Sequence, residues 1–168
     1  MLCNAGCGSG PTKSSAGFLN ARIGSNVFSA FSCGPAYAHT TPHIFFMASI
    51  GASLERVGAG EVTISLPFDR AWTQQNGFLH AGILTTVLDS ACGYAAMSLL
   101  PAGTDVLSVE FKTNLLAPAV GERFEARAAV KRSGRRLAVV VADAFAMAAG
   151  QERLVATMLA TIMRMESE

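Results

Sequence analysis

The sequence predicts an α+β protein in which one antiparallel sheet wraps around a single long helix. Residues 83–100 form a long apolar run that carries one charge, Asp89. A helix that is apolar on all sides is typical of a buried helix. Two strand-like segments precede this run, and four follow it. Runs of strands around one helix are typical of the α+β class, whereas alternating strands and helices would predict a parallel sheet.

A short helix and two strands are expected before the long helix. Residues 40–42 read Thr-Thr-Pro, which suits a helix cap followed by proline in the first turn, and Gly51 ends this helix. Residues 53–57 are expected to form a strand that ends at the glycine-rich turn 58–60. Apolar and polar residues alternate over 62–68, which predicts a half-buried strand.

Four more strands are expected after Pro101-Ala102-Gly103, which stops the long helix. The expected strands cover residues 106–116, 124–131, 137–147 and 154–163. In the first of them, alternation predicts Leu107, Val109 and Phe111 on one face, and Ser108, Glu110 and Lys112 on the other. Residues 137–147 are almost continuously apolar, which favours a central strand.

Residues 1–41 differ in composition from the rest and are interpreted as a poorly ordered N-terminal extension. They are rich in Gly, Ser and Ala, and no Asp or Glu occurs before Glu55. Such a composition resembles an organelle transit peptide, but two basic residues, Lys13 and Arg22, are too few to argue for one. A translation start placed too early is another reading. Residues 42–168 are expected to form one domain.

Charge and cysteine content limit the classes of function. The net charge of +1 does not suggest a nucleic-acid partner. No apolar segment is read as a membrane span. Cys3 and Cys7 have a spacing that is unusual for zinc or redox sites, and Cys92 is most simply a core residue, so no metal or other cofactor is expected. A cytoplasmic protein with reduced cysteines is the default expectation.

The long helix is expected to begin at His80-Ala81-Gly82. The first N–H groups of a helix lack partners within the helix, and the helix dipole adds positive character there. Small residues at Ala81 and Gly82 would let a carbonyl oxygen approach the backbone. This feature is weak evidence by itself, because every helix has such an end.

Asp89 follows Ala81 by eight residues, which corresponds to about 12 Å along a helix. One carbonyl group cannot contact both positions of the same chain. If both act on one substrate, two chains must share each site, as in a homodimer with antiparallel helices. The alternative is a structural Asp89 that bonds to Thr85 or Thr86 one turn back, or to loop amides. For His80, Gln74, Gln75 and Asn76, the alternative is capping of the helix and the loop.

The stretch Gln74-Gln75-Asn76-Gly77-Phe78-Leu79-His80-Ala81-Gly82, with Asp89 nine residues after His80, resembles the PaaI-like branch of the hotdog-fold acyl-CoA thioesterases. Residues 107–112 and 116–119 also resemble that branch. The similarity covers about residues 44–165, and the branch usually has Gly where this chain has Ala81.

The resemblance implies hydrolysis of acyl-CoA or aryl-CoA thioesters, with coenzyme A as part of the substrate. It implies that Asp89 is a general base or a nucleophile and that the Ala81 N–H polarises the thioester carbonyl. His80 would lie near that carbonyl. Gln74 would position the lytic water or the carbonyl, and Ser108 would orient the water. Asn76 and Gly82 belong to the same constellation and are expected to contact the substrate.

Four cations surround the expected hairpin turn Ser133-Gly134. Arg132 and Arg135 are candidates for binding the phosphates of coenzyme A, whereas the alternative is a solvated hairpin. The expected assembly is a homodimer or a dimer of dimers. Two other functions remain open: a hotdog hydratase acting on enoyl thioesters, and a non-catalytic module that binds acyl thioesters.

Overall fold

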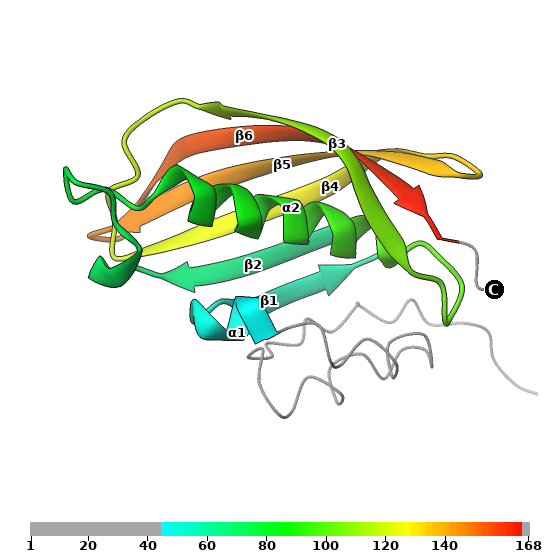
Figure 1. Cartoon of the computed structure of the whole chain (residues 1–168), viewed down its shortest axis with the longest axis horizontal. Coiled ribbons are helices and arrows are strands. Elements are labelled where there is room, and N and C mark those ends of the chain that lie inside the picture. The colour runs from blue at the N-terminus through cyan, green and yellow to red at the C-terminus, as the bar shows by residue number, and fades with distance from the viewer. Residues whose placement is uncertain (1–44, 166–168) are drawn as a thin grey trace, which may run out of the picture.

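Six antiparallel strands form one sheet, and the long helix α2 (Ala81–Met97) lies across its inner face in the computed structural model (Figure 1). The structure describes residues 45–165. The strand order is β1-β2-β4-β5-β6-β3, so β1 and β3 form the two edges. The other elements are α1 (Phe45–Ser49), β1 (Ser53–Gly58), β2 (Glu61–Pro67), a 3-10 helix (Arg70–Trp72), β3 (Val106–Leu115), β4 (Arg123–Ser133), β5 (Leu137–Ala148) and β6 (Gln151–Arg164). The predicted α+β class is confirmed.

Several predictions concern residues outside the described range. They are the N-terminal extension at 1–41, the helix cap at 40–42, and the roles of Cys3 and Cys7. The division of the chain into an extension and a domain therefore stays a prediction. Within residues 45–165, no helix combines the length and the hydropathy that crossing a bilayer requires.

Turn residues delimit the strands much as expected. Gly51 has a φ of +74°, a conformation that glycine adopts without strain, and α1 ends just before it. β6 begins earlier than the expected residue 154, because Ala149 and Gly150 both have positive φ and form a two-residue hairpin turn. Because of this turn, Ala148 at the end of β5 pairs directly with Gln151 at the start of β6, and the ladder between the two strands begins at the turn.

Small side chains on the inner face of the sheet let α2 pack closely against it. β5 is central, as predicted, and every second residue of it from Ala138 to Ala146 is buried. In β6, Ala156 and Ala160 are fully buried in the same core. The helix presents its own small residues to the sheet, including Ala91 and Ala95. Because the facing side chains of α2 and the sheet are small, the helix and the sheet can approach closely.

Within one chain, α2 is buried along one face only. Its buried residues, which recur every three to four positions along one face, are Leu84, Val87, Leu88, Ala91, Cys92, Ala95, Ala96 and Met97. Thr86, Asp89 and Gly93 follow the opposite face and are only half-buried. The sheet of one chain covers one side of a helix, so the apolar character of the second side needs another explanation.

α2 also ends three residues before the predicted Leu100. Ser98 caps it, and the Leu100 N–H bonds to the Met97 carbonyl in a tighter turn. The Ser98 hydroxyl donates to the Ala95 carbonyl at 2.7 Å and accepts from the Gly60 N–H at 2.8 Å. A contact with the β1–β2 turn therefore sets the helix end, before the proline that the sequence suggested.

The predicted alternation along β3 is also wrong, because β3 contains a bulge between Ser108 and Glu110. Ser108 pairs with Ile162, and Phe111 pairs with Ala160, so both point to the inner face. The extra residue of a bulge shifts every later side chain to the opposite face. The bulge thus places Ser108 toward α2, which simple alternation does not predict.

Thr113, on the inner face of β3 opposite Met158, has a buried hydroxyl without a hydrogen-bond partner in the described residues. A buried unpaired hydroxyl costs free energy, whereas an apolar group of the same shape does not. We expect Thr113→Val to raise the free energy of unfolding by about 1 kcal/mol. Urea denaturation measures this change, and Thr113→Ser is the matched control. A marked loss of stability in Thr113→Val would show that the hydroxyl has a partner.

Candidate active site

The start of α2 is held by the side chain of its N-cap residue, His80. His80 Nδ1 accepts a hydrogen bond of 2.9 Å from the Gly82 N–H, and the His80 N–H donates to the Trp72 carbonyl at 2.8 Å. A Cβ atom at position 82 would lie 3.1 Å from His80 Nδ1, so glycine permits this approach. His80 and Gly82 therefore build the helix start, and the Gly82 N–H is already engaged.

Ala81 provides the first N–H group of α2. This group has no acceptor within its own helix, and it donates to no backbone or side-chain acceptor elsewhere in residues 45–165. Ala81 also lines an open pocket of about 390 Å³. The other lining residues are Gln74, Phe78, Leu79, Leu84, Leu115, Leu116, Ala117, Pro118 and Ala119. A carbonyl group that enters this pocket can therefore meet the positive end of the helix dipole.

The loop before α2 is closed by its own hydrogen bonds. The Gln74 side-chain oxygen accepts from the Asn76 N–H, and the Gly77 N–H donates to the Gln74 carbonyl at 2.9 Å. Gly77 has a φ of +79°, which suits this turn. The loop capping that the sequence left open is therefore real for Gln74. Because Gln74 also lines the pocket, its amide nitrogen is the part of the side chain that can donate to a ligand.

Asp89 lies next to Ser108. The Ser108 hydroxyl donates a hydrogen bond of 2.7 Å to Asp89 Oδ1, joining the middle of α2 to the edge strand β3. Thr86 bonds instead to the Gly82 carbonyl at 2.9 Å, so it does not supply the partner that the structural alternative required. No ion pair of Asp89 occurs in the described part of the chain. The carboxylate is half-buried and retains a second oxygen for chemistry.

Cys92 lies three residues after Asp89, but its thiol is not a candidate nucleophile. It is fully buried. Burial, and to a smaller extent the Asp89 carboxylate, raises the pKa of the Cys92 thiol to about 12. The thiolate is the reactive form of cysteine, so Cys92 stays protonated and inert near neutral pH.

We expect Cys92 to resist alkylation by iodoacetamide at pH 8 in the folded protein and to react fully in urea. Peptide mapping by mass spectrometry reads Cys92 separately from the other cysteines. In the unfolded chain the thiol ionises near its ordinary pKa of 9.0, whereas the folded protein keeps the proton until about pH 12. The contribution of Cys92 to stability is therefore complete below pH 9.0 and falls as the pH rises toward 12. Rapid alkylation of native Cys92 would contradict this assignment.

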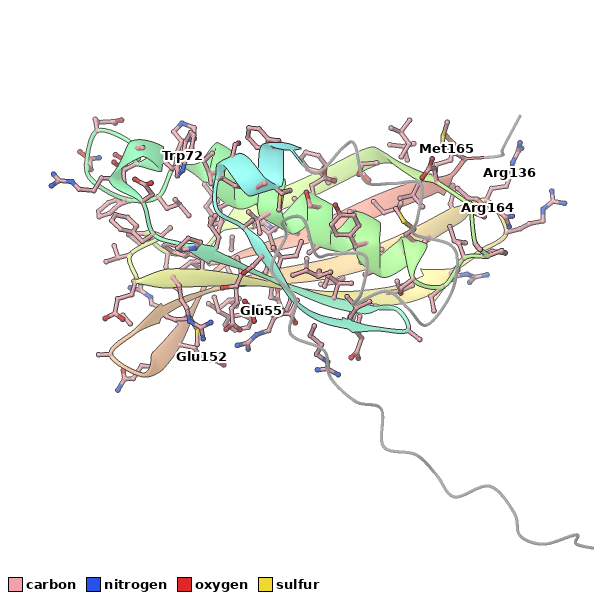
Figure 2. All side chains as sticks on the ribbon, turned by 90° about the horizontal axis from the view of Figure 1, so that it is seen from below. Glu55, Trp72, Arg136, Glu152, Arg164 and Met165 are labelled. Carbon is pink, nitrogen blue, oxygen red and sulfur yellow. The ribbon has the colours of Figure 1, made fainter. Side chains whose placement is uncertain are left out.

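Ala81 and Asp89 are separated along an uninterrupted helix by about 12 Å within one chain. The basic hairpin lies still farther from Ala81. Figure 2 shows Arg136 and Arg164 at one end of the molecule and Trp72, which bonds to the start of α2, at the other. The structure thus brings Asp89 and Ser108 together, but it does not bring them to the helix start of the same chain.

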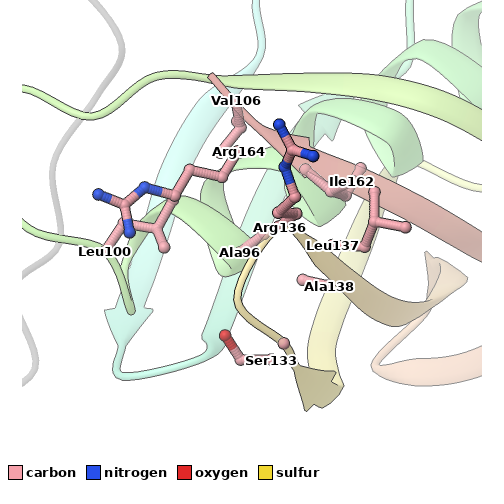
Figure 3. A pocket seen from close by; sticks show the side chains of 10 residues that line it. Ala96, Leu100, Val106, Ser133, Arg136, Leu137, Ala138, Ile162 and Arg164 are labelled. Atoms are coloured by element: carbon pink, nitrogen blue, oxygen red, sulfur yellow. The ribbon is translucent and has the colours of Figure 1, made fainter. Parts of the chain in front are cut away.

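The predicted phosphate ligands Arg132 and Arg135 have exposed side chains on the hairpin between β4 and β5. A small pocket beside the end of α2 is lined by Arg136 and Arg164 instead (Figure 3). Its volume of about 10 Å³ holds roughly one water molecule. A phosphate would therefore bind on the surface of the hairpin and not inside this pocket.

In the sequence, residues 116–119 stand out only for their resemblance to the family, and not as the apolar wall of the pocket at Ala81. This wall consists of residues 115–119, which begin at the last residue of β3, together with Phe78. Leu115 and Leu116 are more than half exposed despite their size. Adjacent leucines followed by proline at a strand end were the available signal, because exposed apolar residues in a turn are typical of a binding surface. Among residues 45–165, no cluster of three or more His, Cys, Asp or Glu side chains could hold a metal.

The strand order and the long helix wrapped by the sheet define a hotdog-fold protein. The family profile of the thioesterase superfamily matches residues 76–149. A thioesterase family protein from Silicibacter pomeroyi is 54% identical, with a TM-score of 0.72, and the match covers 73% of this chain and 90% of that chain. The chain therefore belongs to the thioesterase superfamily, and the predicted resemblance to its PaaI-like members is confirmed.

More distant matches agree in fold. The PaaI protein of E. coli is 18% identical, with a TM-score of 0.70, over 79% of this chain and 92% of that chain. A Bacillus halodurans protein solved with CoA is 23% identical, with a TM-score of 0.58, over 61% of this chain and 66% of that chain. A curated Halobacterium salinarum relative, assigned only provisionally to the esterases, is 31% identical over 55% of this chain. The match spans 64% of that relative, slightly less than two thirds of its length.

Proposed function

We propose that the protein hydrolyses acyl-CoA or aryl-CoA thioesters to a free acid and coenzyme A. The observation that carries this proposal is the Asp89 carboxylate, which Ser108 holds at 2.7 Å on a half-exposed helix face. No cation among residues 45–165 pairs with it. A half-exposed carboxylate that is held in place and has no cation partner can take a proton from water or attack a carbonyl carbon. Family membership and the CoA complex of the Bacillus halodurans protein support the thioester substrate.

Each part of the site has one role in the proposed reaction. The thioester carbonyl accepts a hydrogen bond from the Ala81 N–H, where the helix dipole stabilises the developing oxyanion. As a general base, Asp89 takes a proton from the water that attacks the carbonyl carbon. As a nucleophile, it attacks that carbon and forms an anhydride that water then cleaves. In both routes the C–S bond breaks, and the sulfur of coenzyme A takes up a proton.

The neighbouring side chains have supporting tasks. Ser108 orients the Asp89 carboxylate through its hydrogen bond. In this proposal the Gln74 amide nitrogen donates to the carbonyl or the water, and its support is that Gln74 lines the pocket. Because His80 accepts at Nδ1, a neutral imidazole carries its proton on Nε2, which then serves as the donor toward a ligand. The exposed side chain of Asn76 remains a candidate contact for the substrate.

Two chains share each site in this proposal. The separation of about 12 Å between Ala81 and Asp89 prevents one chain from supplying both groups to one carbonyl. Asp89 and Gly93 lie on the helix face that the sheet leaves half-exposed, where a second helix can pack. β3 is a ten-residue edge strand with exposed Leu107 and Phe111, and such an edge favours pairing with a second copy. A dimer of dimers stays part of the prediction.

An antiparallel arrangement also gives the basic hairpin a task. The end of α2 in one chain then lies near the start of α2 in its partner. The hairpin lies beside the end of α2, so Arg132 and Arg135 of one chain would approach the pocket of the other. Their exposed guanidinium groups can bind the phosphates of coenzyme A on the surface.

A cytoplasmic location belongs to the same proposal.

The alternatives predict different products. A hydratase would use His80 and Asp89 as the acid and the base on one enoyl group and would add water to its double bond. A binding module would retain acyl-CoA without turnover. Incubation with saturated, enoyl and aryl CoA thioesters, followed by thiol detection and mass spectrometry, separates these cases. Release of coenzyme A and free acid supports the proposal, while hydrated thioester or stoichiometric binding without release excludes it.

A further inference from the structure

A second open pocket, of about 460 Å³, lies at the β1 edge of the sheet and shares no lining residue with the pocket at Ala81. Its walls come from the end of α1, from β1 and β2, and from the first residue of β4. Four lining residues have polar or charged side chains, Ser53, Glu55, Ser65 and Arg123, and the other four are small or apolar. This β1-edge pocket is therefore distinct from the candidate active site.

Ser65 is the one polar or charged residue among residues 45–165 that is buried, with 6% exposure. It alternates with the core residues Ile64 and Leu66, so its side chain points to the face of the sheet opposite α2. Its hydroxyl forms no hydrogen bond with another residue of the described range, and unlike the enclosed Thr113 hydroxyl it borders an open pocket. A buried hydroxyl without a partner costs free energy, and a ligand in this pocket can supply the partner.

Glu55 adds a carboxylate without a cation partner to the same pocket. It is the extra residue of a bulge in β1, since pairing with β2 passes from Ile64 to Thr63 around it. Figure 2 shows Glu55 on the side of the sheet away from α2. The Ser53 hydroxyl donates to Glu55 Oε1 at 3.0 Å, and Ser53 pairs with Ser65, so the carboxylate lies close to the Ser65 hydroxyl. No ion pair of Glu55 occurs within residues 45–165, so its other oxygen can accept from a cationic ligand.

Arg123 places a cation on the other side of Ser65. Its Nη2 lies 2.8 Å from Glu125 Oε1, and Glu125 pairs with Ser65 across β2 and β4. Glu125 is shared between two arginines, because its second oxygen lies 2.7 Å from Arg127 Nη2. A guanidinium group has five N–H donors, so Arg123 retains donors for an anionic group of a ligand.

We propose that the β1-edge pocket binds a small amino acid in its zwitterionic form. The ammonium group lies against Glu55 and Ser65, and the carboxylate lies against Arg123. β1 and β4 flank β2 and are about 10 Å apart, which favours a ligand whose two charges are separated by two or three carbons. A ligand with a single charge would leave one charged group of the pocket unmatched. The proposed dimer uses α2 and the β3 edge, so the β1 edge stays open in it.

Isothermal titration calorimetry on the full-length protein tests the need for both charges. The probe is γ-aminobutyrate, and its matched controls are butylamine and butyrate, which each lack one of the two charges. We expect γ-aminobutyrate to bind roughly tenfold or more tightly than either control, because each charge adds a charge-assisted hydrogen bond. Equal binding of the three compounds would overturn the inference. No binding of γ-aminobutyrate at about 20 mM, where a millimolar Kd is measurable, would also overturn it.

Variants then place the ligand in the pocket. Glu55→Gln should weaken binding of both γ-aminobutyrate and butylamine roughly tenfold, whereas Arg123→Gln should weaken only γ-aminobutyrate. Ser65→Ala should weaken binding about threefold through loss of the hydroxyl. Glu61→Gln changes an exposed glutamate of β2 outside the pocket and is the matched control, with binding as in the wild type.

Turnover of acyl-CoA should be unchanged in these variants, because none of the substituted residues lines the pocket at Ala81. Unchanged turnover also shows that each variant is folded. Wild-type affinity in both Glu55→Gln and Arg123→Gln would place the ligand elsewhere and overturn the inference. So would an equal loss of affinity in Glu61→Gln.

Discussion

Asp89→Asn is expected to lower the rate of coenzyme A release by about 10³-fold, since general-base catalysis contributes roughly 10²–10⁴. The amide cannot take a proton from water and is a poor nucleophile. Its oxygen can still accept the hydrogen bond from Ser108, so the join between α2 and β3 should persist. Steady-state turnover and thermal unfolding of the same preparation measure the two effects separately.

Asp143→Asn provides the control for Asp89→Asn. Asp143 is a half-buried carboxylate on β5, opposite Arg127 and Thr157, so the substitution repeats the chemical change on another strand. It should leave turnover nearly unchanged. Near-wild-type turnover in Asp89→Asn would refute the assigned role. A single turnover in ¹⁸O-water distinguishes general-base catalysis from a nucleophilic route in which water opens the anhydride at the Asp89 carbonyl, because only that route leaves label in the Asp89 carboxylate and none in the free acid.

Ala81→Pro is expected to lower turnover by about 10²–10³-fold, the usual cost of losing one oxyanion donor. Proline removes the N–H but suits the first position of a helix. The preceding residue, His80, has φ −63° and ψ 135°, an extended conformation that proline tolerates. The His80 side chain still accepts from the Gly82 N–H. Circular dichroism should therefore show an intact helix in a variant that has lost activity.

Mixing the two variants tests whether the site is shared between chains. In a mixed dimer, the Ala81→Pro chain supplies an intact Asp89, and the Asp89→Asn chain supplies an intact Ala81 N–H. Random exchange of equal amounts makes half of the dimers mixed, each with one complete site, so about a quarter of wild-type activity should return. If both groups acted within one chain, the mixture would stay as inactive as its components.

The long-range features of the site cannot be read from the sequence. Resemblance assigns Ser108 a role, while the strand pattern gives no sign of its direction. The bulge in β3 turns Ser108 toward Asp89, and its position depends on the pairing of β3 with β6. A bulge interrupts the alternation of apolar and polar residues at one position, so the alternation seen in the sequence does not show where the bulge lies. The half-exposed face of α2 could not be predicted for a similar reason. Hydrophobic periodicity does not show how many layers of structure pack around a helix.

The sequence by itself determined the local order of the chain: the turn at Gly51, the central strand at 137–147, and a helix that starts beside His80 and carries Asp89. These features depend on backbone preferences and on spacing between neighbouring residues, which short segments already specify. Only the tertiary structure decided that β3 becomes an edge beside β6, that Ser108 meets Asp89, and that residues 115–119 form an apolar pocket at Ala81. Such contacts join distant segments, and burial of the whole sheet against α2 selects them.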